Sequence, residues 1–247
     1  MTLRALIFDV DETLAETEEG HRASFNEAFR AEALPWHWDR TLYRELLRVG
    51  GGRERLLHYM RAYKVGPADL AEAADLARRL HAAKTPAYQR LLAEKPLAPR
   101  PGVARLIGES RDQGVKLAIA TTSARGNVVA LLQGLFGADA PGWFGTIAAG
   151  EDAEAKKPDP AVYRVALERL GLAPSECVAI EDSTIGLQAA TAAGIAAVVA
   201  PSSWTDDMEF PSALAVARDL DHGPDGKPVT LDRIRHWLEA RRASNPR

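Results

Sequence analysis

Three carboxylates lie within four residues near the start of the chain, in the sequence LIFDVDETL. Asp9, Asp11 and Glu12 directly follow an apolar run that reads as a buried strand. Polar side chains also follow the later apolar runs, namely Thr121-Thr122-Ser123, Lys156-Lys157 after a short acidic loop, and Glu181-Asp182. Because ligands of a parallel sheet bind beyond the carboxyl ends of its strands, we expect these groups to meet at one edge.

The types of these residues indicate phosphoryl transfer. Asp9, Asp11 and Asp182 could not all stay ionised in a desolvated pocket unless cations balanced them. A bound Mg²⁺ and Lys157 would supply that charge, since Mg²⁺ prefers a few hard oxygen ligands together with water and a phosphate. The Thr121 hydroxyl and Lys157 suit the oxygens of a phosphoryl group in transfer. An aspartate can itself be the nucleophile and form an aspartyl-phosphate.

The elements that must position these side chains are short, near-continuous apolar runs, typical of parallel strands covered on both faces. They lie at residues 3–8, 115–120, 144–149, 177–180 and 195–200. Helical patterns lie between them, at 103–112, 125–135, 160–170 and 183–193. This alternation predicts an α/β fold built on a doubly wound parallel sheet.

Residues 16–94 interrupt the alternation, because they contain helical segments and no convincing strand. Pro96, Pro99, Pro101 and Gly102 mark the return to the core. We therefore expect a core domain of residues 1–15 and 95–247 with an inserted helical cap domain of residues 16–94. An amphipathic helix with Leu231 on its apolar face is expected near the end of the chain.

Composition favours a soluble globular protein with a small-molecule partner. Of the 247 residues, 46% are hydrophobic and 26% charged, and the formal net charge of −3 offers no basic surface for nucleic acid. No apolar run is long enough to span a membrane. Cys177 is the single cysteine, which excludes an intrachain disulfide. The amino terminus lacks the pattern of a signal peptide, so we expect a cytoplasmic protein, by default a monomer.

Four motifs, DVDET, TTS, KKP and EDS, follow the predicted strands in this order. Together they resemble the motifs of the haloacid dehalogenase (HAD) superfamily of phosphotransferases. Further stretches resemble the CbbY family of xylulose-1,5-bisphosphate phosphatases and, more distantly, the β-phosphoglucomutases: ETEEGHRASFNEAF, WHWDRTLYRELL, GGRER, HAAKT, KKPDPAVYRVAL and EDSTIGLQAATAAG. The resemblance covers nearly the whole chain. It implies a Rossmann-like core with a cap, and a Mg²⁺-dependent phosphatase of the Calvin cycle.

The same resemblance implies a role for each motif residue. Asp9 would be the nucleophile and a metal ligand. Asp11 would be the general acid and base, and would also bind the metal through its backbone carbonyl. Asp182 would ligate Mg²⁺, and Glu181 would support that ligation.

By resemblance, the phosphoryl group would be held by Thr121 and Lys157, with Thr122 and Ser123 beside it. The cap would select the substrate, because closure of a lid excludes water and completes a site. The cap residues assigned to the sugar and to the phosphate that is not transferred are Glu18, His21, Tyr43, Gly52, Arg53 and Lys84. A second anion site implies a bisphosphate.

These assignments have structural alternatives. Acidic residues at a strand end often cap helices or face water, although four motifs in register favour catalysis. In the cap, His21 could be a packing histidine and Tyr43 part of the cap core, while Arg53 and Lys84 could be solvated charges. Glu12 replaces the Gly usual in these relatives, and we expect its side chain to point away from the phosphate, toward solvent or into loop packing.

The activity also has alternatives. A phosphomutase would use the same residues and return the phosphoryl group to a sugar instead of water. A phosphatase of another small ester, such as phosphoglycolate, is a third possibility. A non-catalytic sensor or scaffold would be expected to have lost one of Asp9, Asp11, Lys157 or Asp182, and all four are present.

Overall fold

The computed structural model describes residues 2–244, with side chains as far as Ala243. The chain forms two compact units. One, here called the core unit, comprises the chain up to Glu16 and from Ala98 onward. The other, here called the helical unit, comprises Thr17–Leu97.

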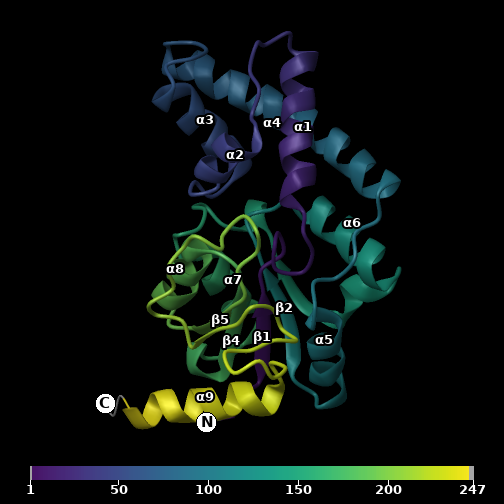
Figure 1. Ribbon diagram of the computed structural model, residues 1–247, viewed down its shortest axis with the longest axis vertical. Helices are drawn as coiled ribbons and strands as arrows, with labels where there is room; N and C mark the ends of the chain where they lie inside the picture. Colours follow the sequence, from purple (N-terminus) through teal and green to yellow (C-terminus); the bar gives the residue numbers. More distant parts are fainter. Residues whose placement is uncertain (1, 245–247) are drawn as a thin grey trace. The chain divides into compact units, whose positions relative to one another are not determined.

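The core unit is built on a parallel sheet that contains six strands in the described residues, in the order β3-β2-β1-β4-β5-β6. Figure 1 labels the central strands β2, β1, β4 and β5. The strands are β1 (Ala5–Phe8), β2 (Lys116–Ala120), β3 (Phe144–Ala148), β4 (Cys177–Glu181), β5 (Ala196–Val199) and β6 (Ala215–Val216). The predicted doubly wound parallel sheet is confirmed. The short edge strand β6 was not predicted.

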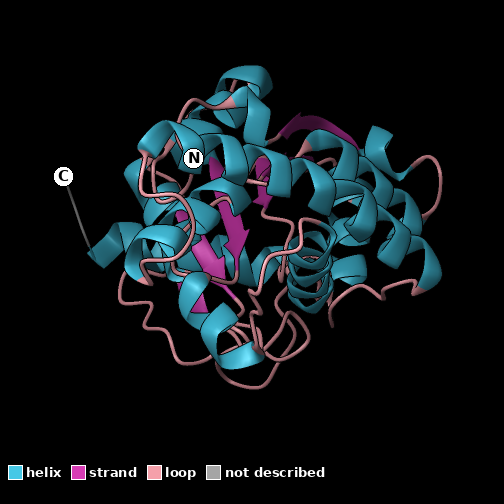
Figure 2. Cartoon of the chain, turned by 90° about the horizontal axis from the view of Figure 1, so that it is seen from above, coloured by secondary structure: helices cyan, strands magenta, loops and turns pink. Residues whose placement is uncertain are grey.

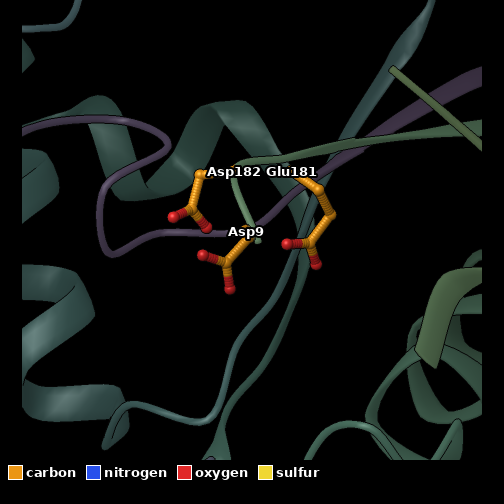
Figure 3. A group of neighbouring side chains, drawn as sticks. All are labelled: Asp9, Glu181 and Asp182. Atoms are coloured by element: carbon orange, nitrogen blue, oxygen red, sulfur yellow. The ribbon is translucent and has the colours of Figure 1, made fainter. Parts of the chain in front are cut away.

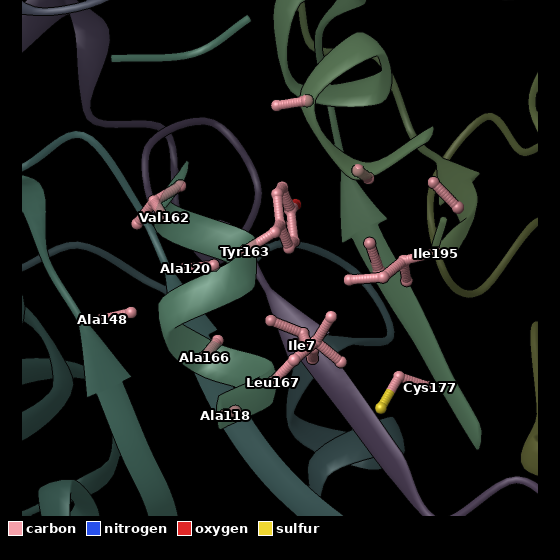
Figure 4. Packing of buried hydrophobic residues seen from close by; sticks show 14 of the residues in the cluster. Ile7, Ala118, Ala120, Ala148, Val162, Tyr163, Ala166, Leu167, Cys177 and Ile195 are labelled. Carbon is pink, nitrogen blue, oxygen red and sulfur yellow. The ribbon is translucent and has the colours of Figure 1, made fainter. Parts of the chain in front are cut away.

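Helices cover both faces of this sheet, as the cyan helices around the magenta strands show in Figure 2. The helices of the core unit are α5 (Val103–Asp112), α6 (Arg125–Phe136), α7 (Ala161–Leu170), α8 (Thr184–Ala192) and α9 (Leu231–Ser244). Short 3-10 turns lie at Ala140–Trp143, Gly150–Asp152 and Pro174–Glu176. One face of the sheet is filled by Ile7, Ala118 and Ala120, against which Tyr163 and Ala166 of α7 pack (Figure 4). Burial on both faces explains why the strands read as continuous apolar runs.

Cys177 begins β4 and belongs to the same buried cluster. Its thiol is free, and burial raises its pKa to about 12. A thiol that stays protonated at neutral pH is a poor nucleophile, so Cys177 serves the packing of the core.

The helical unit consists of α1 (Glu18–Ala31), α2 (Arg40–Leu46), α3 (Gly52–Ala62) and α4 (Leu70–Glu94) in its described residues. Asp69 caps the start of α4 by accepting hydrogen bonds from the backbone N–H groups of Ala71 and Glu72. The unit is held together by aromatic packing around the buried Trp38, whose ring centroid lies 4.8 Å from that of Phe25 and 4.9 Å from that of Phe29. No helix among the described residues is both long enough and apolar enough to cross a bilayer.

Candidate active site

The register of the central strands brings their carboxyl ends to one edge of the sheet. Phe8 of β1 pairs with Ile119 of β2 and with Ile180 of β4. The Asp9 amide then donates to the Ile180 carbonyl at 3.0 Å, so the chain leaves β1 beside the end of β4. The predicted motif residues of these three strands therefore lie close together at this edge.

Lys157 joins two of the carboxylates at the centre of this edge. Its Nζ lies 2.7 Å from Asp9 Oδ1 and 2.6 Å from Glu181 Oε1. The lysine is 4% exposed, so its charge is buried and not solvated. Tyr163 of α7 donates its hydroxyl to the same Glu181 oxygen, and its ring centroid lies 5.0 Å from Lys157 Nζ.

Burial controls the charge of this cluster. It raises the pKa of Asp9, while Lys157 opposes that rise and the negative charges of Glu181 and Asp11 add to it. It also raises the pKa of Asp182 well above its usual value, with repulsion from Asp9 and Glu181 as further causes. Burial alone would lower the pKa of Lys157, but attraction to Asp9 and Glu181 raises it above its usual value. A cation that balances the remaining negative charge would stabilise this edge.

The carboxylates fit a divalent metal ion. Among the described residues, one ligand oxygen each from Asp9, Glu181 and Asp182 lies within 4.8 Å of the others (Figure 3). Lys157 balances one of these three negative charges, and a divalent cation would balance the other two. Glu181 Oε2 is buried and accepts no hydrogen bond from the described residues. Gly186 leaves room for this carboxylate, because a Cβ there would lie 1.8 Å from Oε2.

The capping alternative for Glu181 and Asp182 does not hold. Ser183 is the N-cap of α8, and its side chain accepts the hydrogen bond from the Gly186 N–H. Asp182 instead accepts a hydrogen bond from the Thr205 hydroxyl at 3.3 Å. Both acids are buried at the end of β4 and turned into the cluster.

Asp11 lies beside the cluster and contacts the loop after β2. The Ser123 hydroxyl donates to Asp11 Oδ2. The Ser123 amide donates to the Thr121 hydroxyl at 3.1 Å, and Thr121 is buried while Thr122 is partly buried. The structure thus brings the TTS motif together with the second aspartate of DVDET.

Lys156 does not take part in this cluster in the described contacts, because its Nζ donates to the Gly150 carbonyl. Of the two lysines in KKP, the one directly before Pro158 is therefore the lysine at the carboxylates.

Glu12 is buried, with 2% of its surface exposed, so the expectation that it could face solvent is wrong. Its φ of 60° lies in the left-handed region, which glycine adopts at little cost and other residues rarely adopt. Its charge is among the causes that raise the pKa of Asp182, after burial, Asp9 and Glu181, while Arg100 lowers that pKa. Glu12 is therefore buried in the loop, close enough to the carboxylate cluster for its charge to act on Asp182.

In the helical unit, Lys84 and His21 form a buried pair. Lys84 Nζ lies 2.6 Å from His21 Nδ1, and the His21 ring stacks on Tyr88 with a centroid distance of 3.9 Å. An ammonium group has only donors, so a protonated Lys84 would donate this hydrogen bond to His21 Nδ1. The alternative of a solvated Lys84 is excluded, because the side chain is buried.

Glu18, Tyr43 and Arg55 form a second buried network in the helical unit. The Tyr43 hydroxyl donates to Glu18 Oε2 at 2.6 Å and accepts from Arg55 Nη1 at 2.8 Å. Tyr43 is thus both part of the buried core of the helical unit and the link between a carboxylate and a guanidinium. Arg53, by contrast, is exposed on the first turn of α3, which begins at Gly52.

The sequence did not indicate four side chains that contact the residues above. Arg55 contacts Tyr43, Tyr88 stacks on His21, Arg100 donates to the Glu12 carbonyl, and Tyr163 donates to Glu181. The helical spacing of apolar residues could have indicated Tyr163, because it lies with Val162 and Ala166 on the buried face of α7. The sequence indicates Arg55 only weakly, by its place three residues after Gly52 and next to the buried Leu56.

The chain matches a family of hydrolases and is similar in sequence to known proteins. A family model described as haloacid dehalogenase-like hydrolase matches residues 3–194. Protein CbbY of Rhodobacter capsulatus is 48% identical over 213 residues, which cover 86% of this chain and 92% of that protein.

Solved structures are similar as well. The crystal structure of a CbbY mutant from Rhodobacter sphaeroides in complex with xylulose-(1,5)bisphosphate has a TM-score of 0.82 at 45% identity, covering 88% of this chain and 95% of that one. A β-phosphoglucomutase from Clostridium difficile shares the fold, with a TM-score of 0.77 at 19% identity, over 98% of this chain and 100% of that one. The predicted resemblance is confirmed, and the chain belongs to the haloacid dehalogenase-like hydrolase family of enzymes.

Proposed function

We propose that this HAD phosphatase hydrolyses xylulose 1,5-bisphosphate through an aspartyl-phosphate on Asp9. The observation that carries the proposal is the Lys157–Asp9 contact of 2.7 Å at the end of β1, in a chain 45% identical to a CbbY crystallised with that bisphosphate. A buried ammonium against one carboxylate oxygen suits a nucleophile that must attack an anionic phosphoryl group.

In the proposed first step, a carboxylate oxygen of Asp9 attacks phosphorus, and the bond between phosphorus and the ester oxygen breaks. Asp11 gives its proton to the leaving alcohol. In the second step, Asp11 takes a proton from water, the water oxygen attacks phosphorus, and the bond to Asp9 breaks. Inorganic phosphate leaves, and Asp9 and Asp11 return to their starting states.

The remaining groups stabilise charge and hold the phosphoryl oxygens. Thr121, Lys157 and the loop residues Thr122 and Ser123 take this role in the proposal. Mg²⁺ would be held by Asp9, the Asp11 carbonyl and Asp182, with Glu181 in support, and when bound it would neutralise charge on the phosphoryl oxygens. The acidic cluster around Asp9 supports such an ion.

The helical unit binds the sugar and the second phosphate in this proposal. Lys84 and the imidazole of His21 supply positive charge and a donor, and Gly52 and Arg53 lie at the start of α3. Glu18 accepts from a sugar hydroxyl, and Tyr43 contributes by holding the Glu18 carboxylate.

The test compares specificity constants for xylulose 1,5-bisphosphate, ribulose 1,5-bisphosphate, glucose 1,6-bisphosphate and phosphoglycolate, measuring both inorganic phosphate and isomerised sugar phosphate. We expect the highest value for phosphate release from xylulose 1,5-bisphosphate. Asp9→Asn should lower turnover by more than about 10³-fold with an unchanged circular dichroism spectrum. A preference for phosphoglycolate would reject the substrate, and isomerisation without net phosphate release would reject hydrolysis in favour of a mutase.

A further inference from the structure

Arg100 is a buried cation that the proposed chemistry does not use. It lies in the core unit, two residues after that unit resumes at Ala98. Its guanidinium donates to three backbone carbonyls: those of Glu12, of Ala200 at 2.8 Å, and of Pro201 at 2.7 Å. Its backbone N–H donates to the Leu14 carbonyl at 2.8 Å. A guanidinium offers several donors in a fixed planar arrangement, so these bonds, here called the Arg100 clamp, can hold the loops in one geometry.

The first loop that Arg100 contacts is the loop that carries Asp9 and Asp11. Glu12 follows Asp11 directly, and its φ of 60° costs a residue with a Cβ free energy that glycine would not lose. The turn closes through a hydrogen bond of 3.0 Å from the Glu12 N–H to the Ala15 carbonyl. A strained conformation of this kind persists only where surrounding contacts enforce it.

The Arg100 clamp also contacts Ala200, which in turn is hydrogen-bonded to Glu181 at the end of β4. The Ala200 amide donates to the Glu181 carbonyl at 2.8 Å, and the Ala200 carbonyl accepts from Arg100. The guanidinium therefore connects the turn after β1 to the end of β5, beside the last residue of β4.

We propose that Arg100 is a positioning residue that holds the Asp9–Asp11 loop in its left-handed turn at Glu12, and so sets the position of the Asp11 carboxylate for proton transfer. Arg100 touches no reacting atom in this inference, which rests on the proposed function of Asp9 and Asp11. A general acid displaced by a fraction of an ångström loses rate without a matching loss of substrate binding.

The effects of Arg100 and Glu12 substitutions on kcat should depend on each other. Without Arg100, the turn can relax away from the left-handed region, because Glu12 favours other conformations. Glycine at position 12 removes that preference, so the loop can keep its turn without the Arg100 clamp. Glu12→Gly should therefore rescue an Arg100 variant, and a rescue of this kind does not follow from a general loss of stability.

The test is a double-mutant cycle with Arg100→Gln, Glu12→Gly and the double variant, assayed for phosphate release with Mg²⁺. We expect Arg100→Gln to lower kcat about tenfold and to change KM less than about twofold. The free energy that a non-glycine residue loses in the left-handed region corresponds to about a tenfold change in rate. Glu12→Gly should stay within about twofold of the parent chain. The double variant should recover kcat to within about threefold of the parent.

Arg105→Gln is the matched control. Arg105 also donates to backbone carbonyls, those of Leu220 at 2.6 Å and Val229 at 3.1 Å, but these belong to the carboxyl-terminal segment. It should lower the unfolding midpoint and leave kcat unchanged. Arg100→Lys, which keeps the charge, replaces Arg100→Gln in the cycle if the latter does not fold.

The outcomes separate the proposed function from the positioning role. If the parent chain releases no phosphate from the substrates above, the proposed function fails. If the parent is active but the effects of Arg100→Gln and Glu12→Gly simply add, the Arg100 clamp is rejected and the function stands. A kcat loss for Arg105→Gln equal to that for Arg100→Gln would also reject the Arg100 clamp.

Discussion

Replacing Lys157 with methionine should be costly for both stability and catalysis. The side chain is 4% exposed and lies within 2.7 Å of Asp9 and 2.6 Å of Glu181. Methionine fills a similar volume but removes the cation, which leaves two buried carboxylates without their partner. Breaking a buried ion pair in this way costs about 3–5 kcal/mol. Removing one preorganised charge from a transition state costs about 10²–10³-fold in kcat.

The assay combines urea unfolding at pH 7.5 with phosphate release at saturating substrate. Lys156→Met is the matched control, because this neighbouring lysine donates to the Gly150 carbonyl and not to the carboxylates. We expect the control to change the free energy of unfolding by less than about 1 kcal/mol and to retain most of kcat. Retention of more than a tenth of kcat by Lys157→Met, with unchanged stability, would refute the assigned role of this ammonium group.

Three further predictions concern other parts of the structure. Chelation by EDTA should stop phosphate release and lower the melting temperature, and Mg²⁺ should restore both, because a bound cation offsets the repulsion around Asp9. Asp152→Asn should cost about 1 kcal/mol at pH 7 after allowance for solvent screening. Hydrogen bonding from Arg169 lowers the pKa of Asp152 from its usual value of 3.8 to about 2. The carboxylate therefore stabilises the fold fully above pH 3.8, and this stabilisation is lost as the pH falls toward 2. Free energies of unfolding in urea at pH 7 and pH 2 would detect the loss. Tyr43→Phe should raise KM more than it lowers kcat and reduce stability by about 1–2 kcal/mol, since Glu18 loses a hydrogen bond; equal effects on KM and kcat would contradict its role in binding.

Local patterns were enough to predict the sheet and the residues at its carboxyl edge. Continuous apolar runs marked β1 to β5, and the polar residues that follow them converge because parallel strands end on the same side. The edge strand β6 contains only Ala215 and Val216, which is too short for any periodicity.

Contacts between distant residues could not be predicted from one sequence. Arg100 contacts Glu12 across 88 positions, and neither residue type nor spacing indicates that pairing. The burial of Glu12 was missed for the same reason, because acids in turns are usually solvated. In the helical unit, the sequence pointed to Tyr43 but not to Arg55, whose partner lies on a different helix.

The packing of Cys177 has a practical consequence for spectroscopy. Cys177 is 1% exposed, and the high pKa of its thiol keeps the reactive thiolate scarce at neutral pH. An engineered surface cysteine should therefore react with a maleimide fluorophore without removal of the native one. With one such cysteine in each unit, labelled with a donor and an acceptor dye, energy transfer would measure the distance between the two labels with and without substrate.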